Sequence, residues 1–386
     1  MRLVRAWLLG CLLLASSLSA RAEPNHAVYF YETRSVSLCE WKDLVDELAA
    51  QGYRRIYLNL DEGNFFLLDE VSSRKKITEM ARLAYARGLE LDALTLQDTR
   101  WLEGWAEAVG RVGRLQAFLR ENPQVFSGLH IDVEPHAHQG WEQHTAGERV
   151  EILQKFAFLL RKIREQVKQS KPKLRFSAAL PWWFAATGDE VVRTALPEIH
   201  RELDEVVLMA YDEPGTKLFG EGLATLDKSL DLHRFLKRLP RHRTARLAVA
   251  TYDFASPESL ARGVTAIERR YVREKRFAGV AVFHRSSQYG AHAGRGLSGV
   301  VLDASTEQPL AGAVVEIVEG EGQTISSRCG VFRLSGLGRE RVTVRIAKSG
   351  YETATIEVPL LEPGRDTVLG PTSLRFLPKS SASTTP

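Results

Sequence analysis

Short apolar runs rich in β-branched residues alternate with amphipathic stretches from His26 to about Tyr289, and this alternation limits the fold more than any other feature of the chain. A strand followed by a helix, repeated along a sequence, is typical of an α/β fold with a parallel sheet covered by helices. The strand candidates are, in order, HAVYFYE, RRIYLNLD, LELDALTLQD, SGLHIDVEP, LRFSAALPWW, EVVLMAYDE, ARLAVATYD and GVAVFHR.

Eight strand candidates match the number that closes a (β/α)8 barrel. An open, doubly wound sheet is the alternative, and it usually carries a glycine-rich phosphate-binding turn after a strand. No G-x-G-x-x-G motif follows any of these strands. We therefore predict a (β/α)8 TIM barrel over residues 23–291.

The pattern changes at the glycine-rich segment YGAHAGRG, near Gly290. Helical periodicity ends there, and short alternating segments such as LSGVVLD, GVFRLSGL and TATIEVPL follow, separated by turns. This pattern is typical of a small antiparallel sandwich, so we predict an all-β sandwich domain over residues 292–377. Residues 378–386 are of low complexity and are expected to form a disordered tail.

The first residues have the features of a secretory signal peptide. Arg2 and Arg5 precede an apolar run, and the segment ARA at 20–22 forms a cleavage site of the A-x-A type. The apolar run is too short to span a membrane, and no other segment approaches spanning length. We therefore expect residues 1–22 to be removed and the mature protein to reach a bacterial periplasm or the cell exterior.

The charge of the chain gives little support to a nucleic-acid partner. Its formal net charge is +4 at pH 7, with 52 Lys and Arg scattered among 48 Asp and Glu. A nucleic-acid-binding domain usually gathers its positive charge on one face. We expect no nucleic-acid partner, and the oligomeric state stays open.

Polar and aromatic residues follow almost every strand candidate at its carboxyl end, where the active site of a (β/α)8 barrel lies. Sugars pack their C–H faces on flat rings and bond their hydroxyls to carboxylates, so this lining favours a polysaccharide or oligosaccharide substrate. The predicted substrate-binding residues are Glu32, Asp61, Asp98, Trp101, His130, His136, Trp182, Trp183, Asp212, Tyr252, Asp253 and His284.

The tryptophans leave alternatives open. Trp182 and Trp183 are adjacent, so at most one of them faces the site while the strand continues. Trp101 and Trp141 follow strand ends, where each could line the site or pack in the core.

The segment GLHIDVEP, residues 128–135, ends an apolar run with two carboxylates. Residues two apart on a strand share a face, so His130, Asp132 and Glu134 point one way. The apolar residues between them should face the helices, which directs the polar set to the barrel axis. Two close carboxylates cannot both ionise freely, so one pKa rises, as a general acid near neutral pH requires. A purely hydrogen-bonding role for Asp132 and Glu134 is the alternative.

Three motifs resemble those of glycoside hydrolase family 18, the chitinase-like barrels. SGLHIDVEP resembles the D-x-x-D-x-D-x-E signature on the fourth strand, and FSAALP is similar to the small-residue segment on the fifth. LMAYD matches the M-x-Y-D motif on the sixth strand with Met209, Tyr211 and Asp212. The resemblance covers residues 26–289 in architecture and implies a secreted glycoside hydrolase that cleaves a polysaccharide.

The resemblance also implies roles for single residues. Glu134 would be the acid that protonates the glycosidic oxygen. Asp132 would orient the 2-acetamido group whose carbonyl attacks the anomeric carbon, and Tyr211 would hydrogen-bond that same group. Asp212 would help to place the substrate. The predicted catalytic residues are therefore Glu134, Asp132 and Tyr211.

Some positions depart from the family pattern. Ser127 and His130 stand where the signature has aspartates, and Phe283 or His284 replaces the tryptophan of the eighth strand. The alternative function is therefore a catalytically inactive glycan-binding barrel that acts in cell-envelope or exopolysaccharide recognition.

Two further mechanisms would use Glu134 differently. It could pair with Asp212, Glu213 or Asp253 in the ordinary two-carboxylate hydrolysis. It could also bind a metal with the two histidines of EPHAH, but no H-E-x-x-H or comparable framework supports this. We predict no metal and no cofactor.

The C-terminal domain has a resemblance of its own. GVVLDASTEQPLAGAVVEI, CGVFRLSGL and KSGY, spread over about residues 297–362, resemble the carboxypeptidase regulatory-like domain, a transthyretin-like sandwich. The resemblance implies a structural or adhesive appendage without catalytic residues of its own.

Overall fold

The computed structural model describes residues 25–62, 65–184, 190–211, 232–254, 256–283, 295–318, 320, 322–338, 340–360 and 366–377. The chain divides between residues 289 and 290 into two compact units, and each unit has its own hydrophobic core. The expected signal peptide and the expected C-terminal tail lie outside the described residues.

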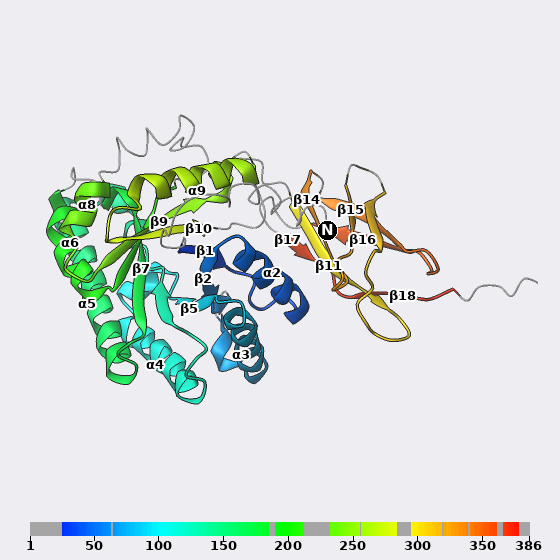
Figure 1. The fold of residues 1–386 in the computed structure, drawn as a ribbon, viewed down its shortest axis with the longest axis horizontal. Helices are drawn as coiled ribbons and strands as arrows, with labels where there is room; N and C mark the ends of the chain where they lie inside the picture. The colour runs from blue at the N-terminus through cyan, green and yellow to red at the C-terminus, as the bar shows by residue number, and fades with distance from the viewer. Residues whose placement is uncertain are drawn as a thin grey trace, which may run out of the picture. The chain divides into compact units, whose positions relative to one another are not determined.

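The first unit is a closed barrel of parallel strands, as the sequence predicts (Figure 1). Each barrel strand pairs with its neighbours in the chain, and the last strand closes the barrel on the first. The barrel strands are β1 (His26–Phe30), β2 (Tyr53–Asn59), β5 (Glu90–Thr95), β6 (Gly128–Ile131), β7 (Arg175–Pro181), β8 (Glu205–Met209), β9 (Thr244–Ala250) and β10 (Phe277–Phe283).

Helices surround the barrel and connect its strands (Figure 1). No helix within the described residues is both long and apolar enough to cross a membrane. The α-helices are α2 (Leu38–Ala50), α3 (Val71–Tyr85), α4 (Trp105–Glu121), α5 (Ala146–Ser170), α6 (Glu190–Glu202), α8 (Leu232–Arg238) and α9 (Pro257–Tyr271). Shorter elements follow the strand ends: the hairpin β3 (Asp61–Glu62) and β4 (Phe65–Phe66), and the 3-10 helices η1 (Leu67–Asp69), η2 (Thr99–Leu102), η3 (Pro135–Ala137), η4 (Trp141–Gln143), η5 (Trp182–Phe184) and η6 (Thr251–Asp253).

Capping residues set where the helices begin. At α2, Ser37 accepts a hydrogen bond from the backbone N–H of Glu40, and the Glu40 carboxylate accepts one from the backbone N–H of Ser37. Thr145 and Glu148 form the same reciprocal capping box at α5. These caps satisfy backbone N–H groups that a helix start leaves unpaired, and they fix the length of the loop after each strand.

The barrel strands bury side chains on both faces. Outward-facing residues such as Ile131 and Val133 belong to the core between strands and helices. Inward-facing residues such as Tyr29, Tyr57 and Ala248 form a separate cluster on the barrel axis. The axis is therefore packed with side chains, as is typical of (β/α)8 barrels.

A buried ion network fills the axis at the amino-terminal end of the strands. Glu205 of β8 accepts hydrogen bonds from Arg55 of β2 at 2.6 Å and from Arg246 of β9 at 3.3 Å. Asp92 of β5 accepts two hydrogen bonds from Arg175 of β7, at 2.8 and 3.1 Å. Burial raises the pKa of Glu205, but the neighbouring guanidinium charges outweigh burial and hold it well below its ordinary value. The network therefore ties five strands together through ionised groups.

The second unit is a small all-β domain of two sheets, as predicted. One sheet has the order β13-β12-β15-β16 and is antiparallel throughout. In the other, β11 pairs antiparallel with β14 but parallel with β17 and β18. The predicted small all-β domain is confirmed, and the short strands β17 and β18 add parallel pairings to its antiparallel sheets. The strands are β11 (Arg295–Asp303), β12 (Val314–Ile317), β13 (Gln323–Ile325), β14 (Val331–Leu337), β15 (Arg341–Ala347), β16 (Ala354–Pro359), β17 (Asp366–Val368) and β18 (Thr372–Leu374).

Candidate active site

The strand β6 brings two carboxyls to the carboxyl end of the barrel. The strand ends at Ile131, and the residues after it continue its alternation. Ile131 and Val133 are fully buried in the core that faces the helices, whereas Asp132 and Glu134 are only partly buried. The alternation expected from GLHIDVEP is therefore present, and the two carboxyls point away from the helix-facing core.

Burial and mutual repulsion keep Asp132 and Glu134 from ionising freely. Burial raises the pKa of Asp132 above its ordinary value. Burial also raises the pKa of Glu134, and the negative charge of Asp132 raises it further. Within the described residues neither carboxyl accepts a hydrogen bond, since the His136 Nε2 atom lies beyond hydrogen-bond distance of Glu134, at 3.7 Å. Of the two, Glu134 is the carboxyl that retains a proton, and both can bond to a substrate.

His136 lies beside Glu134, and Trp183 packs against His136. The His136 Nε2 atom lies 3.7 Å from the Glu134 Oε2 atom, and the ring stands perpendicular to Trp183, with centroids 5.7 Å apart. Trp141 adds a third ring 6.1 Å from that of Trp183. Burial lowers the pKa of His136 to about 4, so its imidazole is neutral at neutral pH. Of the predicted substrate-binding residues, His136 therefore lies beside the predicted acid, and Trp183 lies next to His136.

Aromatic rings also gather where β1, β8 and β10 end. Tyr211 stacks on Phe283 with centroids 5.0 Å apart, and Phe283 meets Tyr31 edge-on at 5.7 Å. Burial raises the pKa of Tyr31, and the charges of Asp132 and Glu134 add to the effect, which places Tyr31 close to both carboxyls. The predicted Tyr211 thus belongs to a cluster of rings beside the carboxyl pair.

Tyr31 and Phe283 are site residues that the predicted set omits. The sequence held a signal for each, because Tyr31 lies two residues after Tyr29 and Phe283 ends the last barrel strand. Residues two apart share a face, so Tyr31 continues the axis-facing side of β1. A tyrosine one layer above a buried tyrosine is the pattern that would have placed it at the site.

His130 lies below the carboxyl pair and is fully enclosed. Its Nε2 atom is 3.0 Å from the Tyr29 hydroxyl, and its Nδ1 atom is 2.8 Å from the Ser177 hydroxyl. Burial lowers the pKa of His130 to about 3, so the ring is neutral. The prediction that His130 binds substrate directly needs correction, because both ring nitrogens are bonded to the protein and the side chain has no exposed surface.

Asp61 and Trp101 are also held by contacts within the protein. Asp61 accepts hydrogen bonds at 2.8 Å from the Thr95 hydroxyl and from the backbone N–H of Leu96, and it pairs with Arg111 at 2.8 Å. Trp101 is 1% exposed, with the Arg111 guanidinium 4.7 Å from its ring centroid. The Asp61 carboxylate has three protein partners and the Trp101 ring is covered, so neither is placed to bind a sugar. Both predictions are corrected.

The remaining predicted site residues lie at strand ends or outside the described residues. Asp98 is exposed and caps η2 by accepting a hydrogen bond from the backbone N–H of Arg100 at 2.8 Å. Three others, partly buried after their strands, are Glu32, Trp182 and Asp253. Asp212 and His284 lie outside the described residues, as does the side chain of Tyr252. The described residues contain no group of three or more His, Cys, Asp or Glu that could hold a metal ion.

Comparison with known proteins gives a family for the second unit. No curated protein matches the chain. Residues 296–372 match the family model of the carboxypeptidase regulatory-like domain. The C-terminal unit is therefore carboxypeptidase regulatory-like. This agrees with the resemblance carried by CGVFRLSGL and KSGY, and the carboxypeptidase regulatory-like unit holds β11 to β18.

Solved structures give the fold of the first unit. A GH18 chitinase from Pseudoalteromonas aurantia is 13% identical with a TM-score of 0.45, and the match covers 68% of this chain and 94% of that one. A chitinase from Chromobacterium violaceum is 12% identical with a TM-score of 0.46, over 69% of this chain and 96% of that one. A GH5_18 protein from Streptomyces cattleya in complex with Manβ1-4GlcNAc is 16% identical with a TM-score of 0.50, over 67% of this chain and 70% of that one. At such identities the likeness to the Streptomyces cattleya structure shows the fold alone, a TIM barrel.

Proposed function

We propose that the protein is a secreted glycoside hydrolase that cleaves a polysaccharide, with Glu134 as general acid and with Asp132 and Tyr211 assisting. The observation that carries the proposal is the pair of carboxyls at the end of β6, in which burial and the charge of Asp132 raise the pKa of Glu134. Two such carboxyls at the catalytic end of a (β/α)8 barrel are suited to acid-assisted cleavage of a glycosidic bond.

Glu134 donates its proton to the glycosidic oxygen as the bond to the leaving sugar breaks, and the water that later attacks the anomeric carbon returns a proton to Glu134. An ordinary glutamate is ionised at neutral pH and has no proton to give. The raised pKa keeps the Glu134 carboxyl protonated, so it can act as an acid there. The neutral His136 beside it, 3.7 Å away, adds no positive charge that would lower this pKa.

Asp132 and Tyr211 act on the sugar that carries the anomeric carbon. Asp132 lies between His130 and Glu134 on the axis-facing side of β6. Its carboxylate orients a 2-acetamido group for attack on the anomeric carbon. The Tyr211 hydroxyl bonds to the same group, while Phe283 holds the Tyr211 ring by stacking at 5.0 Å. An N-acetylated bacterial polysaccharide or peptidoglycan fits this arrangement of roles.

A second candidate function is a catalytically inactive glycan-binding barrel that acts in cell-envelope or exopolysaccharide recognition. Neutral side chains occupy the two positions where the family signature has aspartates, and both have protein partners. The Ser127 hydroxyl is 3.0 Å from the Tyr85 hydroxyl, and His130 bonds to Tyr29 and Ser177. Without a carboxylate at position 130, no further negative charge below Asp132 contributes to raising the pKa of Glu134. The aromatic rings could still bind a sugar.

Secretion is part of the proposal. The mature protein would begin after residue 22 and work in the periplasm or outside the cell, where a glycan substrate is found. The signal-like segment MRLVRAWLLGCLLLASSLSARA supports this location.

The test pairs cleavage with binding. Three forms of the mature chain are compared: the parent, Glu134→Gln and Glu142→Gln. The Glu142 side chain is exposed in η4 of the loop that follows β6, so its variant is the matched control. Each form is incubated with N-acetylated and uronic-acid polysaccharides, and new reducing ends and retained affinity are measured together.

The two functions predict different results. For the hydrolase, parent and Glu142→Gln release reducing ends, whereas Glu134→Gln loses at least about a hundredfold in rate and keeps its affinity. For the binding barrel, all three forms bind the glycan and none releases reducing ends. Absence of both cleavage and binding across the panel would overturn both proposals.

A further inference from the structure

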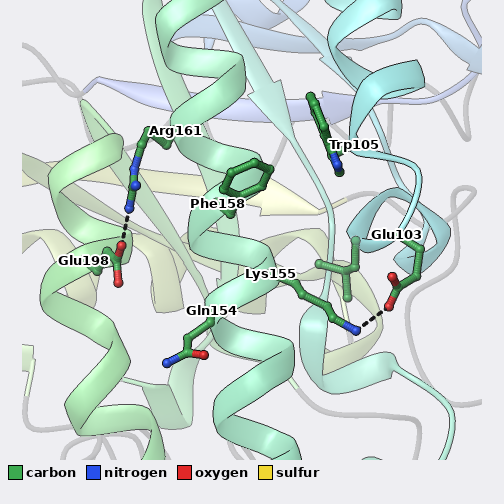
Figure 2. A pocket seen from close by; sticks show the side chains of 8 residues that line it. Glu103, Trp105, Gln154, Lys155, Phe158, Arg161 and Glu198 are labelled. Atoms are coloured by element: carbon green, nitrogen blue, oxygen red, sulfur yellow. Dashed lines mark hydrogen bonds and ion pairs between the residues drawn. The ribbon is translucent and has the colours of Figure 1, made fainter.

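A hollow of about 600 Å³ lies in the helix layer of the barrel, between η2 and the helices α4, α5 and α6 (Figure 2). Its size is within the range of pockets that hold small ligands. The lining alternates aromatic and charged side chains, and none of them belongs to the carboxyl pair or the rings beside it. Neither family resemblance gives a function to the residues of this hollow.

Two half-exposed aromatic rings lie at its centre. Trp105 is 39% exposed and Phe158 is 37% exposed, and the rings stand perpendicular with centroids 5.4 Å apart. The Lys162 Nζ atom is 5.6 Å from the Phe158 centroid, so Trp105 is the ring with the more available face. A large aromatic side chain left partly in water at a concave surface is a common mark of a binding site.

Ion pairs lie on both sides of the rings. Figure 2 shows Lys155 with Glu103 on one side of Phe158, and Arg161 with Glu198 on the other. The Lys155 Nζ atom is 2.7 Å from Glu103. The lining therefore carries two positive and two negative charges, each held by an opposite partner. A charged ligand would have to separate one of these pairs, whereas a neutral polyhydroxyl ligand can bond to them as they stand.

We propose that this hollow is a second glycan-binding site, which takes the neutral pyranose units of a polysaccharide on the Trp105 ring. The C–H face of the sugar packs on the indole, and its hydroxyls bond to the Gln154 amide and to the outer oxygens and N–H groups of the ion pairs. The inference rests on the proposed function, because it takes the ligand of the barrel to be a glycan.

The place of Trp105 in the barrel links this site to the candidate active site. Trp105 is the first residue of α4, which follows β5 and η2. The start of a barrel helix lies on the side where the preceding strand ends, which is the side of the active site. A polysaccharide held on Trp105 is therefore on the same side of the barrel as Glu134, and the site serves to retain a long chain.

The test uses a signal that belongs to this hollow alone. The mature chain with Glu134→Gln, which cannot consume the ligand, is labelled with 5-fluorotryptophan, and the Trp105 resonance is identified with Trp105→Phe. The probes are neutral pentasaccharides of N-acetylglucosamine, glucose and mannose, with oligochitosan as the cationic and oligogalacturonate as the anionic comparison. Fluorine NMR follows each tryptophan during titration.

We expect the Trp105 resonance to shift with at least one neutral pentasaccharide and to respond at least about tenfold more weakly to the charged ones. Phe158→Ala should weaken that titration about tenfold, since the perpendicular ring packs against Trp105. The control is Phe376→Ala, which removes a 53% exposed ring from a similar perpendicular pair with Tyr351, at 5.4 Å, in the other unit. It should leave the Trp105 titration unchanged.

Other results overturn the inference and leave the proposed function separately testable. If only Trp182 or Trp183 responds, the glycan binds at the active site and the outer hollow is not a glycan site. If no tryptophan responds to any neutral probe, the hollow is not a site for them, and reducing-end release by the parent still decides the hydrolase. An equal response to the charged probes would refute the selectivity for neutral sugars.

Discussion

At the residue scale, the candidate site depends on two carboxyls that receive no hydrogen bond from the described part of the chain. Asp61, which follows β2, two strands away from β6 in the barrel, shows the opposite case, with three protein donors around it. The difference lies in the surroundings, since both kinds of carboxyl follow barrel strands. Burial raises the pKa of Asp132, and burial together with the charge of Asp132 raises the pKa of Glu134.

Replacing Asp132 with asparagine should lower the pKa of Glu134. The charge of Asp132 is the second cause of the rise, after burial, so the pKa should fall toward the ordinary 4.5 and stay above it. The side-chain carboxyl of Glu134, assigned with Glu134→Gln, can be titrated by carbon NMR in both proteins. Because the acid must hold its proton, the alkaline limb of any hydrolysis profile should move to lower pH in Asp132→Asn. An unchanged titration midpoint would mean that Asp132 does not act on Glu134 through its charge, and Glu142→Gln serves as the silent control.

At the scale of elements, the ion network joins β2, β5, β7, β8 and β9 below the site. Glu205 is 3% exposed and bonds to the guanidinium groups of Arg55 and Arg246. Charges buried this deeply gain little from being paired, but they cost much when one partner is lost. The network therefore holds the strand ends in place and makes the barrel sensitive to any change within it.

Glu205→Gln should destabilise the barrel by about 3–5 kcal/mol, because two buried guanidinium groups lose their carboxylate. The folded pKa of Glu205 is lowered, so its stabilisation is present above the ordinary 4.5 and is lost as pH falls below it. Urea unfolding at pH 7 and at pH 4 measures both effects. The control is Glu90→Gln, which removes a more exposed partner of Arg175 and should cost less than about 1 kcal/mol. Equal losses in the two variants would contradict the buried network.

Gly128→Ala should also be costly, because β6 passes close to Asp92. A Cβ at this position would lie 2.5 Å from the Asp92 carboxyl, which Arg175 holds in place with two hydrogen bonds. The expected loss is about 2–3 kcal/mol in the free energy of unfolding. Gly110→Ala in α4 has open space around its Cβ and should stabilise the fold by up to about 1 kcal/mol. Thermal unfolding of the two variants should therefore shift in opposite directions.

The order of the elements could be predicted from the sequence, but the contact partners of many side chains could not. The alternation in GLHIDVEP is local, so it fixed which way Asp132 and Glu134 point. The partners of His130 and Asp61 are distant, since Tyr29 is 101 residues from His130 and Arg111 is 50 residues from Asp61. Only the closed barrel brings such pairs together, and this is why two predicted substrate-binding residues are structural.

At the scale of the whole molecule, each of the two units has a large hydrophobic core of its own within the described residues. The larger core lies between the barrel strands and their helices. The smaller one lies between the two sheets of the carboxypeptidase regulatory-like unit and includes Val315, Val344 and Ile346, none of which is exposed. Units with independent cores unfold as separate cooperative transitions.

Val344→Ala should lower one calorimetric transition and leave the other in place. The cavity left in the sandwich core should cost about 2 kcal/mol. Val280→Ala makes the same change in β10, where the side chain is also unexposed, and should lower the other transition. A single transition that shifts in both variants would show that the two units unfold together.

The bonded ring of His130 has a consequence for turnover in the proposed reaction. Tyr29 and Ser177 lie within hydrogen-bond distance of its two nitrogens, and burial keeps the ring neutral, so His130 is not a proton donor to Glu134. A proton that Glu134 has given away is returned by the water that then attacks the anomeric carbon, with Glu134 acting as base. That water can reach the anomeric carbon only after the departing piece of glycan has left the site. The rate of repeated cleavage would therefore depend on how quickly this product dissociates.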